Sequence, residues 1–213
     1  MSTYPEPPWT TYGQARFRAY LVDADRIQPP NGMKLRSRVG RSLGLLGYID
    51  YRRPSPLPYR ELLWMPGRVE VRDREGRTRR GWYVAKMLVD DGASLAAGRE
   101  LWALPKELAS FESSGAEVVM RAGDGAVVRW RSRPGPGVRG KGAVLTLQRR
   151  QNELVRFRGV FTGRIAPALC RVDCEGLDES WQGLSSAVPF GPLGTELRDF
   201  CAEMGAPKSS SLV

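Results

Sequence analysis

The sequence contains no histidine, and this absence removes several kinds of active site at once. Without an imidazole the chain cannot build a Ser-His-Asp triad, a Cys-His pair or a histidine-ligated metal centre. Any acid-base chemistry must therefore depend on Glu, Asp, Lys, Tyr or Cys. Much of the range of hydrolases and metalloenzymes is excluded.

Cysteine and long apolar runs are also scarce. The three cysteines are an odd number, which fits a reducing compartment. Cys170 and Cys174 have neither a second pair nor a histidine nearby, so we expect ordinary strand or loop cysteines and no metal site. No run of about 18 apolar residues is present, and Met1–Pro8 lacks the basic and apolar parts of a secretory signal. The sequence predicts a cytoplasmic protein without a membrane partner.

Lysine is rare in a chain that is otherwise strongly basic. The net charge is +10, from 33 lysines and arginines against 23 acidic residues. The five lysines are Lys34, Lys86, Lys106, Lys141 and Lys208. A basic surface can bind nucleic acid, but the arginines are spread from Arg16 to Arg198 without a recognisable nucleic-acid-binding motif. Nucleic-acid binding is therefore the weaker alternative, and a lysine in an apolar setting is the stronger signal.

The hydrophobic pattern is that of a mainly β protein. Short segments with alternating or compact apolar residues are separated by clusters of Gly, Pro and Asp, which is typical of strands and turns. In Leu154–Ile165, Val155 and Phe157 alternate with Arg156 and Arg158, as in a strand with one buried face. The expected strands are Arg16–Asp23, Leu43–Tyr51, Tyr59–Met65, Val69–Asp73, Trp82–Val89, Glu117–Ala122, Ala126–Ser132, Ala143–Gln148 and Leu154–Ile165.

Two segments break this pattern and predict helices. Gly92–Leu101 has the composition of a short helix capped by Asp90 or Asp91. Leu193–Met204 has apolar residues at helical spacing, and Pro207–Val213 is expected to be a loose tail. Because no repeat or linker is visible, we expect one domain over residues 1–213, mainly β (α+β). In it, a strongly curved antiparallel sheet closes into a barrel or cone and so removes its exposed edges.

Two segments carry a resemblance to a known family. Gly98–Ala109 reads GRELWALPKELA, and Ser55–Leu63 reads SPLPYRELL. The first is similar to the Gly-Arg-Glu and Pro-Lys signature of the acetoacetate decarboxylase-like superfamily, and the second resembles that superfamily's Ser-Pro and Tyr-x-Glu-Leu segment. The resemblance implies a closed or cone-like antiparallel β fold, a lysine that forms a Schiff base with a keto acid, an active-site glutamate and a homo-oligomer. We expect no cofactor and no metal.

Lys106 is the candidate nucleophile. It follows the first expected helix and Pro105, and it lies among the apolar residues of Leu101–Leu104 and Leu108–Ala109. An amine attacks a ketone only when it is neutral, and at a reference pKa of about 10.4 roughly one lysine in 2,500 is neutral at pH 7. Burial among apolar groups lowers the pKa, and acetoacetate decarboxylase is itself a known example of a lysine activated in this way. The alternative is a surface lysine whose stem lies over apolar residues.

Glu61 is the candidate proton-transfer residue. It lies in the apolar strand Tyr59–Met65, where a carboxylate that points into a cavity would have a raised pKa and could exchange a proton with a reaction intermediate. The alternative is an outward side chain paired with Arg52, Arg53 or Arg60. The resemblance favours the inward position.

Three further residues are candidates for binding the substrate, namely Tyr59, Arg99 and Trp102. A guanidinium is the natural partner of a keto-acid carboxylate, so Arg99 could hold the substrate. It could equally form an ion pair that fixes a helix to the sheet. The sequence leaves both roles open.

The sequence therefore predicts a Schiff-base enzyme that acts on a small keto acid, most simply by decarboxylation of a β-keto acid. The decarboxylases proper carry Pro-Lys-Lys, whereas Glu107 stands here in place of the second lysine. Aldol, dehydration or hydration chemistry through the same iminium is thus an alternative. A non-catalytic ligand-binding barrel is another, although such a barrel would need neither Lys106 nor Glu61.

Overall fold

The computed structural model describes residues 4–211, and strands dominate them. These residues contain one α-helix, α1 (Gly92–Trp102), and three short 3-10 helices at Ala24–Arg26, Glu179–Trp181 and Leu184–Ser186. The strands are β1 (Trp9–Asp23), β2 (Lys34–Leu35), β3 (Arg41–Arg52), β4 (Arg60–Met65), β5 (Gly67–Arg72), β6 (Thr78–Tyr83), β7 (Lys86–Val89), β8 (Lys106–Ser114), β9 (Glu117–Ala122), β10 (Val127–Pro134), β11 (Val138–Arg150), β12 (Glu153–Glu175), β13 (Val188–Pro189), β14 (Leu193–Met204) and β15 (Lys208–Ser211).

Nine strands close into a barrel, and the sequence predicted the barrel, although β8 and β14 were not among the expected strands. Their order is β10-β9-β8-β7-β4-β3-β1-β14-β12, and β12 pairs with β10 to complete the ring. The barrel is mixed rather than wholly antiparallel, because β7 and β8 run parallel. Helix α1 connects these two strands, and a parallel pair requires a long crossover of this kind. The crossover therefore delivers the chain to the start of β8, where Lys106 lies.

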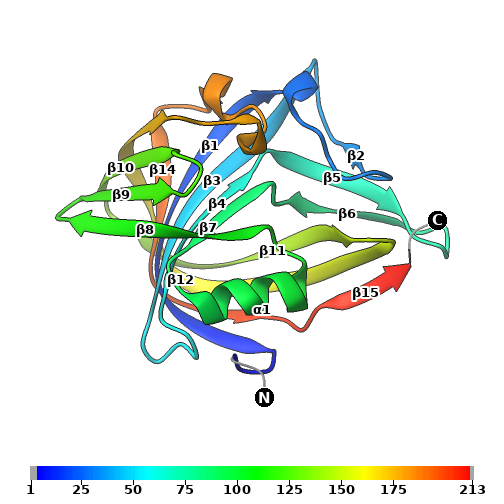
Figure 1. Ribbon diagram of the computed structural model, residues 1–213. Coiled ribbons are helices and arrows are strands. Elements are labelled where there is room, and N and C mark those ends of the chain that lie inside the picture. Colours follow the sequence, from blue (N-terminus) through cyan, green and yellow to red (C-terminus); the bar gives the residue numbers. More distant parts are fainter. Residues whose placement is uncertain (1–3, 212–213) are drawn as a thin grey trace.

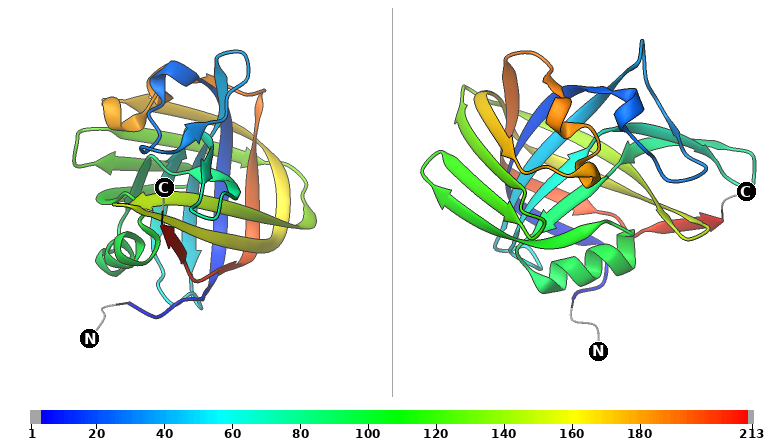
Figure 2. Two further views of the ribbon diagram at one scale, coloured as in Figure 1. Left: turned by 90° about the vertical axis from the view of Figure 1, so that its right-hand side faces the viewer. Right: turned by 45° about the horizontal axis from the view of Figure 1, so that its top comes forward.

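The sheet continues beyond the barrel because β12 is long enough to pair with two strands in succession along its length. Its second half, from Ala168 to Glu175, pairs with β10, and its first half, from Glu153 to Ile165, pairs with β11. Strands β6, β5 and β2 follow β11 in order, and we call β11, β6, β5 and β2 the extension. In Figure 1, β8, β9 and β10 lie on one side of the central strands β1, β3 and β4, and the extension lies on the other. The right-hand view of Figure 2 shows the same separation.

The central strands therefore bury both of their faces. Toward the barrel interior they contribute Tyr20, Leu46 and Trp64 to a core that also contains Met120 and Trp130. Toward the extension they contribute to a second apolar cluster, whose members include Trp9, Leu63, Trp102, Phe157 and Phe200. In β4 all residues from Glu61 to Met65 are buried, which explains why this strand reads as a compact apolar run.

The helix predicted before Pro-Lys is confirmed as α1. The Asp91 side chain accepts a hydrogen bond from the Ser94 backbone N–H at 2.6 Å, so Asp91 is the N-cap. This is the one α-helix among residues 4–211, and no helix in this range has the length and apolar character needed to cross a membrane.

The predicted C-terminal helix is wrong, since Leu193–Met204 forms strand β14 between β1 and β12. The helical spacing has a local cause. Leu197 pairs with Ala15 and Phe200 with Gly13, so three steps along β14 match two along β1. The extra residue is a β-bulge, with Asp199 at φ 49°. It places Leu197 and Phe200 on one face at a spacing of three, which a sequence pattern cannot distinguish from a helix.

Two smaller expectations also need correction. Pro207–Val213 was expected to be a loose tail, but Lys208–Ser211 forms β15 and pairs with the start of β12, while residues 212 and 213 lie outside the described part. The single strand expected over Trp82–Val89 is divided into β6 and β7. The break lies where the chain passes from the extension to the barrel, and Gln148 donates a hydrogen bond to the Val84 carbonyl there.

Candidate active site

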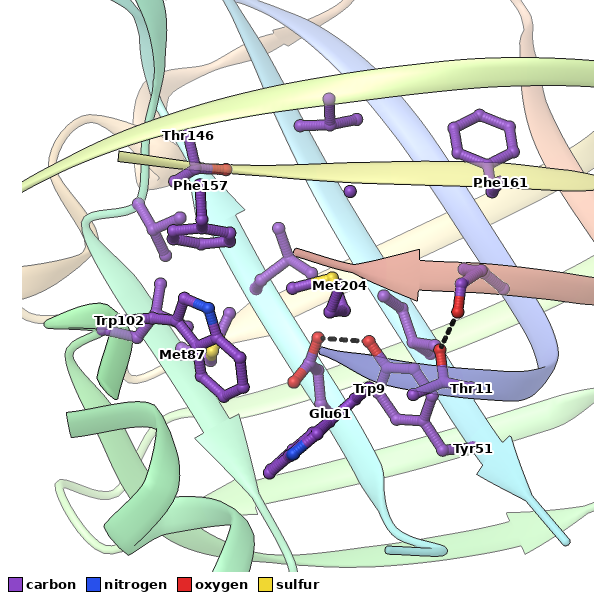
Figure 3. Close-up of a pocket in the computed structure, with 18 of the residues that line it drawn as sticks. Trp9, Thr11, Tyr51, Glu61, Met87, Trp102, Thr146, Phe157, Phe161 and Met204 are labelled. Carbon is purple, nitrogen blue, oxygen red and sulfur yellow. Dashed lines mark hydrogen bonds between the residues drawn. The ribbon is translucent and has the colours of Figure 1, made fainter. Parts of the chain in front are cut away.

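A cavity of about 150 Å³ lies between the outer face of the barrel wall and the paired strands β11 and the first half of β12. Its lining residues come from β1, β3, β4, β7 and β14 on the wall and from β11 and β12 opposite. Trp102 at the end of α1, Lys106 at the start of β8, and Tyr59, Val84 and Leu104 in the connecting segments complete it. Figure 3 shows Glu61 and Tyr51 on one side, with Phe157 and Phe161 across from them.

Lys106 points into this cavity with only 2% of its surface exposed. Its Nζ lies 2.8 Å from Ser94 Oγ, 3.3 Å from the Tyr59 hydroxyl and 3.4 Å from Glu61 Oε2. Burial lowers the pKa of the Lys106 ammonium below its ordinary value, although the Glu61 carboxylate works in the opposite direction. Desolvation is the larger effect, so the neutral amine is favoured relative to a lysine in water.

The turn between α1 and β8 fixes the position of Lys106. Ala103 ends the helix in the left-handed conformation, at φ 54°. Gly98 leaves the space for the lysine stem, because a Cβ at this position would lie 2.4 Å from Lys106 Cδ. The Arg99 guanidinium donates a hydrogen bond of 2.8 Å to the Lys106 carbonyl oxygen. The Gly-Arg pair of the motif therefore shapes the lysine's surroundings through packing and a backbone contact.

Glu61 projects from β4 into the same cavity and is 4% exposed. The Tyr51 hydroxyl donates to Glu61 Oε1 at 3.2 Å, a contact drawn in Figure 3, and the Tyr59 hydroxyl donates to Oε2 at 3.1 Å. Burial, reinforced by the Glu61 charge, raises the pKa of both phenols well above the ordinary value. Both tyrosines therefore stay protonated as donors to the carboxylate. The alternative, in which Glu61 points outward and pairs with an arginine, does not match the contacts described for Glu61. Arg60 pairs with Asp90 instead.

The structure brings four of the five candidate residues together. Glu61, Lys106, Tyr59 and Trp102 all line the cavity, whereas Arg99 does not and contacts the Lys106 backbone instead. Two contributing residues were not found from the sequence. Tyr51 is ten residues from Glu61 on the neighbouring strand, and Ser94 is twelve residues before Lys106 in α1. No local pattern marks either one, because strand pairing and the helix crossover create both contacts.

Among the described residues that line the cavity, only Lys106 has a basic group and only Glu61 has a carboxyl group. No arginine is among them. Within residues 4–211 no cluster of three acidic or sulfur side chains is placed to hold a metal ion. The cavity is therefore an apolar space with one amine-carboxylate pair.

Glu107 belongs to a separate cluster around the buried Lys86. Its carboxylate accepts hydrogen bonds from Lys86 Nζ at 3.0 and 2.9 Å, and Asp124 pairs with the same ammonium at 2.9 Å. Burial would lower the pKa of Lys86, but these two carboxylates outweigh it and raise that pKa. Because successive side chains of a strand point to opposite faces, Glu107 faces away from the cavity that Lys106 enters. The two buried lysines thus have opposite electrostatic environments.

Comparison with known proteins agrees with this architecture. Among solved structures, the enduracididine biosynthesis enzyme MppR in complex with pyruvate superposes with a TM-score of 0.68 at 14% identity, covering 97% of this chain and 91% of that one. An acetoacetate decarboxylase-like enzyme from Sphingomonas wittichii gives 0.62 at 17% identity, covering 98% and 95%. The acetoacetate decarboxylase of Legionella pneumophila gives 0.60 at 18% identity, covering 100% and 90%.

The sequence comparisons place the chain in a family. No curated protein sequence matches it significantly. The family model for acetoacetate decarboxylase, however, matches residues 2–169, which is well over half of the chain and includes both motif segments and the candidate lysine and glutamate. The chain belongs to the acetoacetate decarboxylase family.

Proposed function

We propose that this protein is a Schiff-base enzyme that decarboxylates a β-keto acid with Lys106 as the nucleophile. The observation that carries the proposal is the buried amine of Lys106, held 3.4 Å from Glu61 in an otherwise uncharged cavity. An amine with a lowered pKa is nucleophilic closer to neutral pH. Lys86 offers no comparable amine, because its two acidic partners keep it protonated.

The reaction follows from the neutral amine. Lys106 Nζ attacks the ketone carbon of the substrate, and the carbinolamine takes up a proton and loses water to give an iminium. The bond between the α-carbon and the carboxylate then breaks, CO₂ leaves, and its electron pair forms an enamine with the positively charged nitrogen as the electron sink. Protonation of the enamine carbon and hydrolysis release the ketone and the amine. The net reaction consumes one proton per keto-acid anion and yields one ketone and one CO₂.

Glu61 is placed to move protons in this cycle. Its carboxylate lies beside the reacting nitrogen, and Tyr51 and Tyr59 fix its two oxygens. Those two hydrogen bonds hold the carboxylate toward Lys106 without supplying a competing positive charge. We assign to Glu61 the transfer of protons to and from the carbinolamine and the enamine. Tyr59 and Trp102 are proposed to contact the substrate. Arg99 has the role of a positioning residue, through the Lys106 carbonyl.

Aldol condensation or dehydration through the same iminium is the second candidate. Solved structures similar to this chain include MppR with pyruvate and with the condensation product of pyruvate and imidazole 4-carboxaldehyde, so this fold accommodates condensation products of a keto acid. The presence of Glu107 does not decide between the reactions, because its side chain pairs with Lys86 away from the cavity. Release of CO₂ from a β-keto acid separates the two candidates.

Reductive trapping tests the proposal. With borohydride and acetoacetate or pyruvate, one adduct is expected on the peptide that contains Lys106. The Lys106→Met variant should give no adduct, and Lys141→Met, at an exposed lysine, should be labelled like the parent protein. An adduct on another lysine, or no adduct with any keto acid, would overturn the Schiff-base mechanism. If an adduct is trapped but no β-keto acid releases CO₂, aldol condensation or dehydration remains as the proposed reaction.

A further inference from the structure

Nearly all side-chain hydrogen-bond donors among the described residues that line the cavity already have a protein partner. The indole N–H groups of Trp9 and Trp102 donate to backbone carbonyl oxygens at 2.9 and 3.2 Å. The Thr11 hydroxyl donates to the Ala202 carbonyl at 3.3 Å, and both tyrosine hydroxyls of the cavity donate to Glu61. A substrate that enters the cavity therefore meets few free donors.

The hydroxyl of Thr146 is the exception. Thr146 lines the cavity from β11 with 4% of its surface exposed, and it lies directly opposite Phe157 of β12 in the paired strands. In Figure 3 no dashed line reaches its hydroxyl, and no group within residues 4–211 forms a hydrogen bond with it. A buried hydroxyl without a partner is unfavourable, so a bound ligand is the natural partner for this one.

The position of Glu61 restricts where the carboxylate of a keto acid can lie. Glu61 Oε2 is 3.4 Å from Lys106 Nζ, the atom that attacks the ketone carbon in the proposed reaction. A substrate carboxylate beside Glu61 would bring two negative charges together in an apolar space, which is unfavourable. Thr146 and Phe157 lie across the cavity from Glu61 (Figure 3). The substrate carboxylate is therefore expected to turn away from Glu61 and toward this opposite wall.

The opposite wall offers the carboxylate one donor. The lining residues that β11 and β12 contribute are Val144, Thr146, Phe157, Gly159 and Phe161. Among these, Thr146 alone has a polar side chain. The cavity volume of about 150 Å³ equals that of an engineered cavity that binds one benzene in another protein. Acetoacetate is similar in size to benzene, so it spans the cavity from Lys106 to the opposite wall.

We infer that the Thr146 hydroxyl binds the carboxylate of the keto-acid substrate by donating a hydrogen bond to one of its oxygens. The inference rests on the proposed Schiff-base function, because the bond to Lys106 Nζ fixes the ketone carbon. The iminium supplies the positive charge that balances the carboxylate, and Thr146 sets the direction of the carboxylate. When the carbon-carboxylate bond breaks, CO₂ leaves and the electron pair passes to the iminium nitrogen. The hydrogen bond is therefore stronger in the bound keto acid than in the transition state.

Thr146→Val tests the inference, because it removes the hydroxyl and keeps the shape of the side chain. We expect KM for acetoacetate to rise about tenfold or more, since a hydrogen bond to a charged group typically contributes that much to binding. The value of kcat for CO₂ release should not fall, because the lost contact is weaker in the transition state. Thr146→Ser retains a hydroxyl and should restore the parent KM. An unchanged KM in Thr146→Val, or a fall in kcat alone, would overturn the inference.

A neutral ketone of the same shape separates carboxylate binding from packing. Methyl isobutyl ketone has an isopropyl group where acetoacetate has its carboxylate. Trp9 and Trp102 line the cavity, so rapid-mixing fluorescence should report the binding of both ligands before turnover. In Thr146→Val we expect the Kd of acetoacetate to rise about tenfold or more relative to the Kd of the ketone. Thr11→Val is the matched control, because the Thr11 hydroxyl already donates to a backbone carbonyl. It should leave the ratio of the two Kd values unchanged, and an equal rise in this control would overturn the inference.

These measurements separate failure of this inference from failure of the proposed function. Fluorescence reports binding whether or not an imine forms. If no keto acid gives a borohydride adduct but Thr146→Val still weakens acetoacetate relative to the ketone, the Schiff-base function fails and the carboxylate site is supported. If Lys106 is trapped and CO₂ is released, but the ratio of Kd values is the same in Thr146→Val and the parent protein, the carboxylate site is overturned and the proposed function is supported.

Discussion

At the scale of single residues, the proposed chemistry depends on two opposing effects on the pKa of one amine. Desolvation lowers the pKa of Lys106, and the Glu61 carboxylate 3.4 Å away raises it. Removing that carboxylate therefore has two separable consequences. The pKa of Lys106 falls further because the strongest interaction that favours the ammonium is lost and only the charge of Asp91 still favours it, and proton transfer loses its carrier.

Glu61→Gln tests both consequences in one variant. We expect turnover to fall at least tenfold, since a positioned acid-base group typically contributes about 10² to 10⁴. At the same time, inactivation of Lys106 by an amine-selective reagent should begin at lower pH than in the parent protein, because the amine is neutral over a wider range. Glu107→Gln is the control. It should leave the pH profile of Lys106 inactivation unchanged, because Glu107 pairs with Lys86. A profile that moves to higher pH in Glu61→Gln would contradict the electrostatic argument.

At the scale of secondary-structure elements, the junction of α1 and β8 sets the position of Lys106, the proposed nucleophile. Alanine is a better helix former than glycine by about 1 kcal/mol, so Gly98 weakens the helix that contains it. Its benefit is space, since Lys106 Cδ and Cε would lie 2.4 and 2.6 Å from a Cβ at position 98. Both atoms belong to the catalytic candidate, so any displacement moves the amine.

Gly98→Ala should therefore leave the fold intact and impair the site. The expected result is a native circular dichroism spectrum with at least a tenfold slower borohydride trapping of Lys106. Gly92→Ala in the same helix is the matched control, because nothing lies within 4 Å of a Cβ there. Parent-like trapping in Gly98→Ala would show that the lysine stem tolerates the methyl group.

At the scale of the whole molecule, the central sheet separates a filled core from an open site. Met120 is fully buried inside the barrel, whereas Met204 is half-buried and borders the cavity. Truncation of a close-packed methionine loses contacts on all sides. A side chain beside an existing cavity has fewer contacts to lose.

Paired truncations measure this difference. Met120→Ala is expected to lower the free energy of unfolding by about 2–5 kcal/mol, and Met204→Ala by less than about 1 kcal/mol, as measured by urea unfolding. Equal losses would show that the cavity side of the sheet is as tightly packed as the barrel core. The comparison uses the same substitution at both positions, so the intrinsic change in side chain cancels.

The sequence by itself determined the features that follow from local patterns. Alternating apolar residues marked most of the strands, and the pair Asp90-Asp91 marked the start of α1, where the structure shows that Asp91 is the cap. The Pro-Lys motif identified Lys106 as the candidate nucleophile. Each of these signals lies within about a dozen neighbouring residues. Backbone geometry and solvent contact impose such patterns directly on the chain.

Only the tertiary structure decided which of these residues meet. Lys106 bonds Tyr59 across 47 positions of sequence, Arg99 points to a backbone carbonyl, and Glu107 pairs with Lys86 on the opposite face of β8. The bulge at Asp199 made a strand read as a helix, and the apolar cavity exists only because β11 and β12 lie over the barrel wall. Strand register and the crossover of α1 fix these contacts, and pairing between distant segments leaves no periodic trace in the sequence.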